Sequence, residues 1–243
     1  PRMIIFYLLA LISEILGTLC GFGSSVFFVP LAGFFFEPKT VLGLTAVFHV
    51  VSNLSKLVLF RKHIDYRIFR LFGLPSFLGV LLGAMLSVWF TLTYGSLFLG
   101  IFLLIFAVAF LLRPEWEIAP TAKNAITGGA AAGFFAGLLG TGGAIRGAAM
   151  ASYNLEKSVF IATSAAVDMG VDLTRTVIYI GNDYVAIDKF WYIPGLIAVS
   201  FVGSYIGRYL LGFISQQAFR KTVLLLIVVI GIVSIVHYLY MLK

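Results

Sequence analysis

Four basic residues lie within long apolar stretches of this chain rather than in polar loops: Lys56, Arg146, Arg175 and Arg208. A charge in hydrocarbon costs at least about 2.5–3.5 kcal/mol, so each needs an ionic partner, a route to water or a function. Arg208 is close to the end of its stretch, and Lys56 precedes the polar segment that begins at Arg61, so both side chains can extend to water. Arg146 has no such exit and is the best candidate for a binding role.

Arg146 directly follows a glycine-rich break, in a segment of small residues. A helix that restarts after such a break presents free N–H groups and the positive end of its dipole. A guanidinium beside that end suits sulfonate, sulfite or carboxylate oxygens. The expected anion site in this segment therefore comprises Gly140, Thr141, Gly142, Gly143 and Arg146. The alternative is a structural ion pair of Arg146 with one of two aspartates, Asp168 or Asp172.

Polar residues recur at the same spacing of i, i+4 and i+7 in two apolar segments: His49, Asn53 and Lys56, then Asp168, Asp172 and Arg175. This spacing places each set on one helix face. Carboxylates in dry surroundings hold protons more readily, and histidine titrates near neutral pH. Asp168, Asp172, His49 and the apolar-embedded Glu14 are therefore the proton-coupling candidates. The alternatives are an Asp172–Arg175 ion pair, a packing histidine, and Glu14 as partner of a buried cation.

The elements that must position these residues occur twice. A glycine segment at 17–23 is matched by another at 133–143, and Gly79/Gly83 is matched by Gly203/Gly207. The commonest meaning of Gly-xxx-Gly in membrane helices is close packing. A duplicated helix set with matching glycine breaks is typical of a transporter whose site lies between its halves. We expect a first repeat at 1–112, a linker at 113–123 and a second repeat at 124–243.

Composition indicates a membrane protein. Of 243 residues, 61% are hydrophobic and 11% are charged, with mean hydropathy +1.06, whereas soluble domains have about 25% charged residues. We expect an all-α polytopic fold surrounded by lipid. The net charge of +7 reflects basic loops that set membrane orientation, not a nucleic-acid partner. The single cysteine, Cys20, excludes an intrachain disulfide. No cofactor or metal is expected, and a homodimer is left open.

Each repeat is expected to contain about four helical segments, the first of them glycine-broken, at 3–36 and 124–154. The others lie at 40–60, 68–90, 93–112, 158–180, 190–213 and 219–241. The broken segments either cross once, giving eight crossings and parallel repeats, or form re-entrant hairpins, giving inverted repeats. Eight crossings place Lys157, Arg220 and Lys221 opposite the 61–70 loop. The distribution of basic residues in the loops does not distinguish the single-crossing topology from the hairpin topology. Both topologies place the 61–70 loop and the linker on the cytoplasmic side.

The two glycine segments, Gly-x-x-x-Gly-Phe-Gly-x-x-x-x-x-x-Pro at 17–30 and Gly-x-x-x-Gly-Leu-Leu-Gly-Thr-Gly-Gly at 133–143, resemble the TauE/SafE sulfite exporter family. The resemblance covers nearly the whole chain. It implies a proton-driven secondary transporter of small sulfur-containing or carboxylate anions in a bacterial inner membrane. The first repeat departs from the fuller glycine pattern, because Ser24 and Ser25 stand where the second repeat has glycines before its arginine.

The function expected is export of sulfite or an organosulfonate by alternating access. Arg146 would provide the fixed charge, Ser24, Ser25 and Thr141 would orient the oxyanion, and Lys56 or Arg175 would assist. The alternatives are an anion channel, a carrier of small carboxylates, or a structural subunit of a larger complex. An intramembrane enzyme is not expected, because the chain has neither a Gly-x-Gly-Asp motif nor a Gly-x-Ser-Gly elbow.

Overall fold

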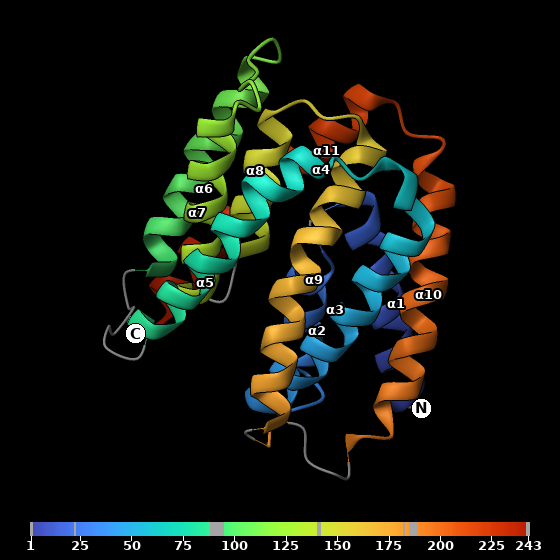
Figure 1. The fold of residues 1–243 in the computed structure, drawn as a ribbon. Helices are drawn as coiled ribbons and strands as arrows, with labels where there is room; N and C mark the ends of the chain where they lie inside the picture. Colours follow the sequence, from blue (N-terminus) through green and yellow to red (C-terminus); the bar gives the residue numbers. More distant parts are fainter. Residues whose placement is uncertain are drawn as a thin grey trace.

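The computed structural model describes residues 2–21, 23–87, 95–139, 142–181, 183–184 and 189–241, and the regular elements in this part of the chain are all helical. The elements are α1 (Arg2–Cys20), α2 (Ser25–Ala32), α3 (Pro38–Phe60), η1 (Arg61–His63), α4 (Tyr66–Ile68), η2 (Phe69–Gly73), α5 (Leu74–Ser87), α6 (Gly95–Leu112), α7 (Ala122–Leu139), α8 (Gly142–Ser152), α9 (Lys157–Gly181), α10 (Tyr192–Leu211) and α11 (Gln216–Met241). Figure 1 shows them as one bundle of mostly upright helices.

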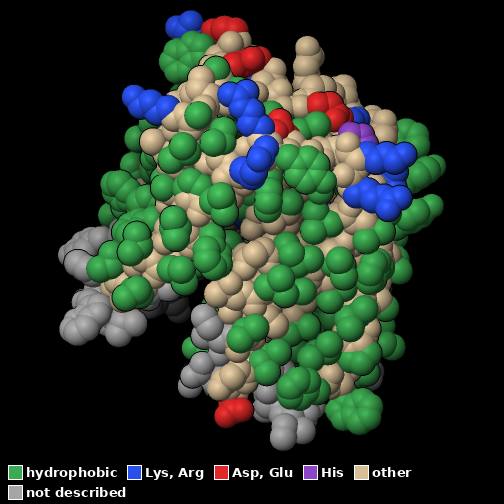
Figure 2. Space-filling model, in the orientation of Figure 1, with side chains coloured by type: hydrophobic (Ala, Val, Ile, Leu, Met, Phe, Trp, Pro, Cys, Tyr) green, Lys and Arg blue, Asp and Glu red, His purple; other side chains and the backbone are tan. Residues whose placement is uncertain are grey.

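Within the described residues, five stretches are long and apolar enough to cross a membrane: Arg2–Cys20, Gly43–His63, Tyr66–Gly83, Tyr192–Leu211 and Gln216–Val236. The outer surface is covered with hydrophobic side chains, which Figure 2 shows in green. The predicted all-α polytopic membrane fold is therefore confirmed. Helix α9 has 25 residues but is not among the five, because every window of spanning length in it holds at least three charged residues. That polarity is tolerated because α9 packs against α3 and α8 and turns Asp168 and Asp172 toward partners on these helices.

Each glycine-broken segment is a pair of helices that returns to the end at which it began. The ring of Phe6, near the start of α1, lies 5.5 Å from Phe35 and 5.3 Å from Phe36, which follow α2. At the other pair, the N–H of Ile118, before α7, donates to the carbonyl oxygen of Ser152, at the end of α8, at 2.8 Å. The α1–α2 hairpin opens at the lower end of Figure 1, and the α7–α8 hairpin opens at the upper end.

The glycine pairs bring helices of opposite halves into contact. A methyl group at Gly79 of α5 would lie 2.6 Å from the carbonyl oxygen of Ala130 on α7. A methyl group at Gly207 of α10 would lie 2.6 Å from Cβ of Thr18 on α1. These positions require glycine, which confirms close packing as the meaning of the Gly-xxx-Gly pairs. The long arm of each hairpin thus packs against a helix from the other half of the chain.

Basic side chains gather at the end of the molecule that carries α4, which we call the basic end (Figure 2). Arg220, at the start of α11, donates from Nη1 to the carbonyl oxygen of Pro114 in the linker at 2.7 Å. Nζ of Lys157, at the start of α9, donates to the carbonyl oxygen of Ile214 at 2.6 Å. The eight-crossing arrangement places these two cations at the end opposite the 61–70 loop. In the structure both cations lie at the same end as the 61–70 loop, because each hairpin turns back to the end at which it began.

Candidate functional site

The carboxylate of Glu14 lies at the centre of a buried polar network formed by three helices and by Ser24, which precedes α2. Glu14 on α1 has no exposed surface, and the ammonium of Lys56 on α3 lies 2.8 Å from its Oε1. Four hydroxyl groups also donate to this carboxylate: Ser52 at 2.7 Å, Ser204 at 2.8 Å, Thr18 at 3.3 Å and Ser24 at 2.8 Å. We call these six residues the Glu14 network. The Glu14 carboxylate and the Lys56 ammonium can both be buried because each is paired with the other and hydrogen-bonded.

Lys56 therefore does not extend to water. Its side chain is 3% exposed, and its Nζ also donates to Oγ of Ser52 at 2.5 Å. Of the roles considered for Glu14, the structure shows the partner of a buried cation. The interfacial position considered for Lys56 is wrong, because its side chain is buried and its Nζ is paired with Glu14 of α1.

His49 connects the Glu14 network to Asp172 on α9. Its Nε2 lies 3.3 Å from Oγ of Ser24, and its Nδ1 lies 3.6 Å from Oδ2 of Asp172. Asn53 donates to the same aspartate oxygen at 2.9 Å. A continuous series of polar groups thus runs from Glu14 through Ser24 and His49 to Asp172. It joins α1, α3 and α9, and so both halves of the chain.

Arg146 forms a second network on α8 and α9. Its Nε donates to Oγ of Ser164 at 2.8 Å, and its Nη1 is paired with Oδ1 of Asp168. The side chain is 6% exposed, against 13% for Asp168. A small cavity of about 20 Å³ adjoins this pair, between α5, α7, α8 and α9, with Ser76 and Gly133 in its wall. This volume suits roughly one water molecule.

Some of the predicted site residues lie in these two networks, and others do not. Ser24 lies with Glu14 and His49 and not opposite Arg146, because the α1–α2 hairpin packs on α3 and α10. Gly142 begins α8 and Gly143 lines the cavity. Ser25 begins α2 and belongs to neither network. Gly140, Thr141 and the side chain of Arg175 lie outside the described residues.

Four hydroxyl residues were not foreseen from the sequence: Thr18, Ser52, Ser164 and Ser204. A partial signal exists, because Thr18 follows Glu14 by four residues and Ser52 precedes Lys56 by four, spacings that put each pair on one helix face. Ser164 precedes Asp168 and Ser204 precedes Arg208 by the same spacing, but nothing local shows that they contact Arg146 and Glu14. In the part of the chain that the structure describes, every buried side-chain nitrogen or oxygen has a hydrogen-bond partner.

Arg208, the fourth embedded cation, packs against an aromatic ring and belongs to neither network. Its guanidinium lies 5.6 Å from the centroid of the Phe60 ring, near the basic end. Among the described residues, no group of three His, Cys, Asp or Glu side chains is placed to hold a metal ion. The candidate site therefore consists of two separate charge networks that share α9.

Comparison with known protein families decides the class of protein. The sequence model of the sulfite exporter TauE/SafE matches residues 6–234. The chain belongs to the TauE/SafE sulfite exporter family. No curated protein and no solved structure matches it. A TauE/SafE protein is a multi-pass membrane protein of a family of sulfite and anion exporters, and both charge networks lie within this membrane-spanning bundle.

Proposed function

We propose that this TauE/SafE protein is a proton-coupled secondary transporter that exports a small sulfur oxyanion, sulfite or an organosulfonate, by alternating access across a bacterial inner membrane. One observation carries the proposal most directly. Arg146 is buried on the short arm of a broken hairpin, and it is paired with Asp168, a carboxylate that an oxyanion can replace. The five N–H donors of a guanidinium match the planar oxygen pairs of carboxylate and sulfite groups alike.

Asp168 couples the anion to a proton in this proposal. An anion that approaches Arg146 meets the negative charge of Asp168, with which it competes for the same guanidinium. Protonation of Asp168 removes that charge and releases Nη1 of Arg146. Proton binding and anion binding therefore favour each other by the same free energy, as linkage requires. Anion and proton would then cross in the same direction.

For a divalent anion such as sulfite, the membrane potential gives this coupling a driving force for export. A divalent anion that leaves with one proton carries one net negative charge outward. An inside-negative potential favours that movement by about 2.3 kcal/mol for each 100 mV. Cations at the basic end orient this end toward the cytoplasm by the positive-inside rule, so the pathway from Arg146 would load on that side.

We assign the Glu14 network a supporting role. The Lys56–Glu14 pair holds the α1–α2 hairpin against α3 and α10, and Asp172, His49 and Ser24 form a series of neighbouring polar groups that could relay a proton. Asp172 follows Asp168 by one helical turn on α9. A proton accepted near Arg146 therefore has acceptors nearby that belong to the first half of the chain.

Uptake of labelled sulfite into inverted proteoliposomes tests the proposal, because inversion turns export into uptake. Wild type, Arg146→Gln and a matched control, Lys221→Gln, are compared under an imposed potential and pH gradient. Lys221 is exposed at the basic end, so its loss removes the same charge without touching either network. We expect saturable uptake in the wild type and the control, and loss of at least about 100-fold in Arg146→Gln.

Sulfite uptake that does not saturate would indicate the channel alternative. No sulfite uptake by a folded wild type would remove the substrate assignment and lead to sulfonates and carboxylates as the next probes. Uptake in Arg146→Gln equal to wild type would reduce Arg146 to a structural ion pair with Asp168.

A further inference from the structure

An apolar groove of about 470 Å³ opens on the side of the molecule, and Val171 lines both this groove and the cavity beside Arg146. Its wall is formed by α3, by the segment from Ile64 to Phe77, and by α9 from Ala166 to Leu173. None of its lining residues is charged. The volume lies within the range of about 300–1,000 Å³ that is usual for ligand pockets. One of its walls belongs to Tyr66–Gly83, a stretch long and apolar enough to cross a membrane.

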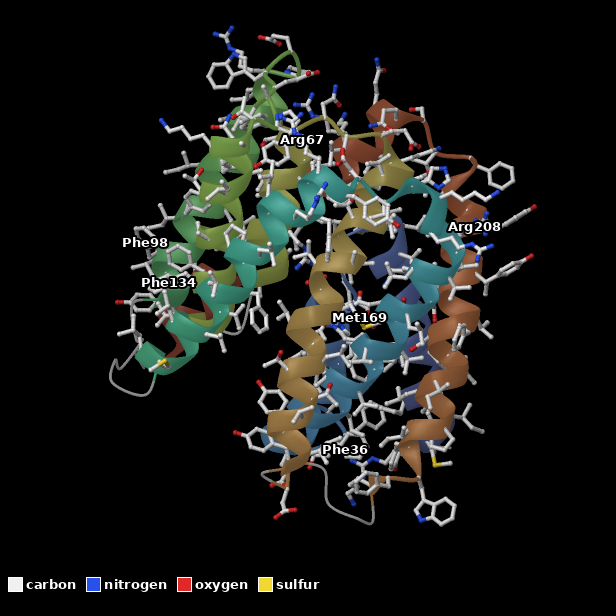
Figure 3. The ribbon with its side chains drawn as sticks, in the orientation of Figure 1. Phe36, Arg67, Phe98, Phe134, Met169 and Arg208 are labelled. Atoms are coloured by element: carbon white, nitrogen blue, oxygen red, sulfur yellow. The ribbon has the colours of Figure 1, made fainter. Side chains whose placement is uncertain are left out.

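The end of the groove nearest α4 is basic. Tyr66 and Phe69 line it there, and the residues beside them in sequence, Arg67 and Arg70, are exposed. Nε of Arg70 donates to the carbonyl oxygen of Tyr66 at 3.2 Å, which holds its guanidinium close to the segment. Within the described residues, the guanidinium of Arg67 has no hydrogen bond or ion pair. Figure 3 places Arg67 toward the basic end, with Met169 of α9, a lining residue, farther down.

Small residues keep the groove open. Gly170 of α9 lines it, and a methyl group added at Gly170 would meet no atom within 4 Å. Across from it, η2 is a short π-helix that ends at Gly73, which also lines the groove. Single turns of π-helix occur mostly at functional sites. The groove therefore separates two walls that come from different halves of the chain.

We propose that this groove holds an acyl chain of one anionic phospholipid, whose headgroup phosphate is bound by Arg67 and Arg70. An apolar groove at membrane depth with cations at its interfacial end is complementary to that lipid at both of its ends. Tyr66 stands between the two regions, at the level where aromatic rings with a polar tip are favoured. The inference does not depend on which anion the protein carries or on whether it carries one.

Native mass spectrometry of the full chain in detergent tests the proposal, with phosphatidylglycerol and phosphatidylcholine of identical acyl chains as probes. We expect one phosphatidylglycerol to be retained, with at least about fivefold preference over phosphatidylcholine for each arginine involved. Arg67→Gln with Arg70→Gln should remove that preference. Lys221→Gln, which removes an exposed cation of the same end, should leave it unchanged.

The groove itself is tested by Gly170→Leu, which fills it. This variant should lower retention of both lipids about tenfold while the thermal unfolding midpoint stays at or above that of wild type. If Gly170→Leu fails to fold, Leu173→Trp narrows the same wall at a half-exposed position. Unchanged lipid retention in a folded groove-filled variant would overturn the proposal, since charge alone would then explain binding. Equal retention of the two lipids by wild type, or a dimer mass without lipid, would overturn it as well.

Discussion

Replacing Lys56 by methionine tests whether the Glu14 network stabilises the fold as a unit. Methionine keeps the length of the side chain and removes the charge, so the Glu14 carboxylate stays buried with four hydroxyl donors and no counterion. At 2.8 Å and an effective dielectric constant of about 20, the Lys56–Glu14 attraction is about 6 kcal/mol before desolvation is subtracted. Removing one partner of a buried pair typically costs about 3–5 kcal/mol. We expect a loss of that size in the free energy of unfolding.

The companion variants decide between a charge effect and a packing effect. Glu14→Gln leaves Lys56 unpaired and should cost a similar amount, whereas the double variant removes both charges and should cost less than either single variant. Chemical unfolding of the purified protein in mixed micelles, followed by circular dichroism, gives the four free energies of the cycle. Additive losses in the double variant would refute the reasoning, because they would mean that the two charges do not interact.

Three further predictions use the same structure. Gly207→Ala should destabilise the protein by about 1–3 kcal/mol, because its methyl group would lie 2.6 Å from Cβ of Thr18, while Gly170→Ala should stabilise it by up to about 1 kcal/mol; unfolding midpoints that move together would contradict this. Asp168→Asn should make sulfite uptake nearly independent of pH, since the competing charge is absent at every pH, and a wild-type pH profile in this variant would exclude Asp168 as the coupling group. His49→Gln should slow proton transport at least about tenfold while the affinity for sulfite changes much less. Proton transport followed with a pH-sensitive dye and sulfite affinity measured on the same sample give the two values.

The fold class was accessible from the sequence because it depends on composition and spacing. Too few charged residues are present to cover a water-facing surface, and the helical stretches follow from their length. The Gly-xxx-Gly pairs indicated close packing, which Gly79 and Gly207 confirm. Their partners were not accessible, since nothing local shows that α5 packs on α7 and α10 on α1. Those contacts join residues some 50 to 190 positions apart.

Several residues of the candidate site were predicted from the sequence, but which of them contact each other was not. The i, i+4, i+7 stripes on α3 and α9 drew attention to His49, Asp168 and Asp172 because a helix repeats its face at that spacing. The two stripes do contact each other, through His49 and Asp172. Ser24 was expected opposite Arg146, and the structure places it beside Glu14 because its hairpin packs in the other part of the bundle.

The sequence alone thus determined that the chain is helical, lies in lipid and carries buried charges that require partners, since these follow from hydrophobicity, periodicity and the cost of an unpaired charge. Only the tertiary structure decided which partner each charge has. Lys56 pairs with Glu14 at 42 positions' separation, and Arg146 pairs with Asp168 across the turn between α8 and α9. Pairing depends on which helix faces meet, and that is set by hairpin geometry and by glycine contacts between distant segments rather than by any local pattern.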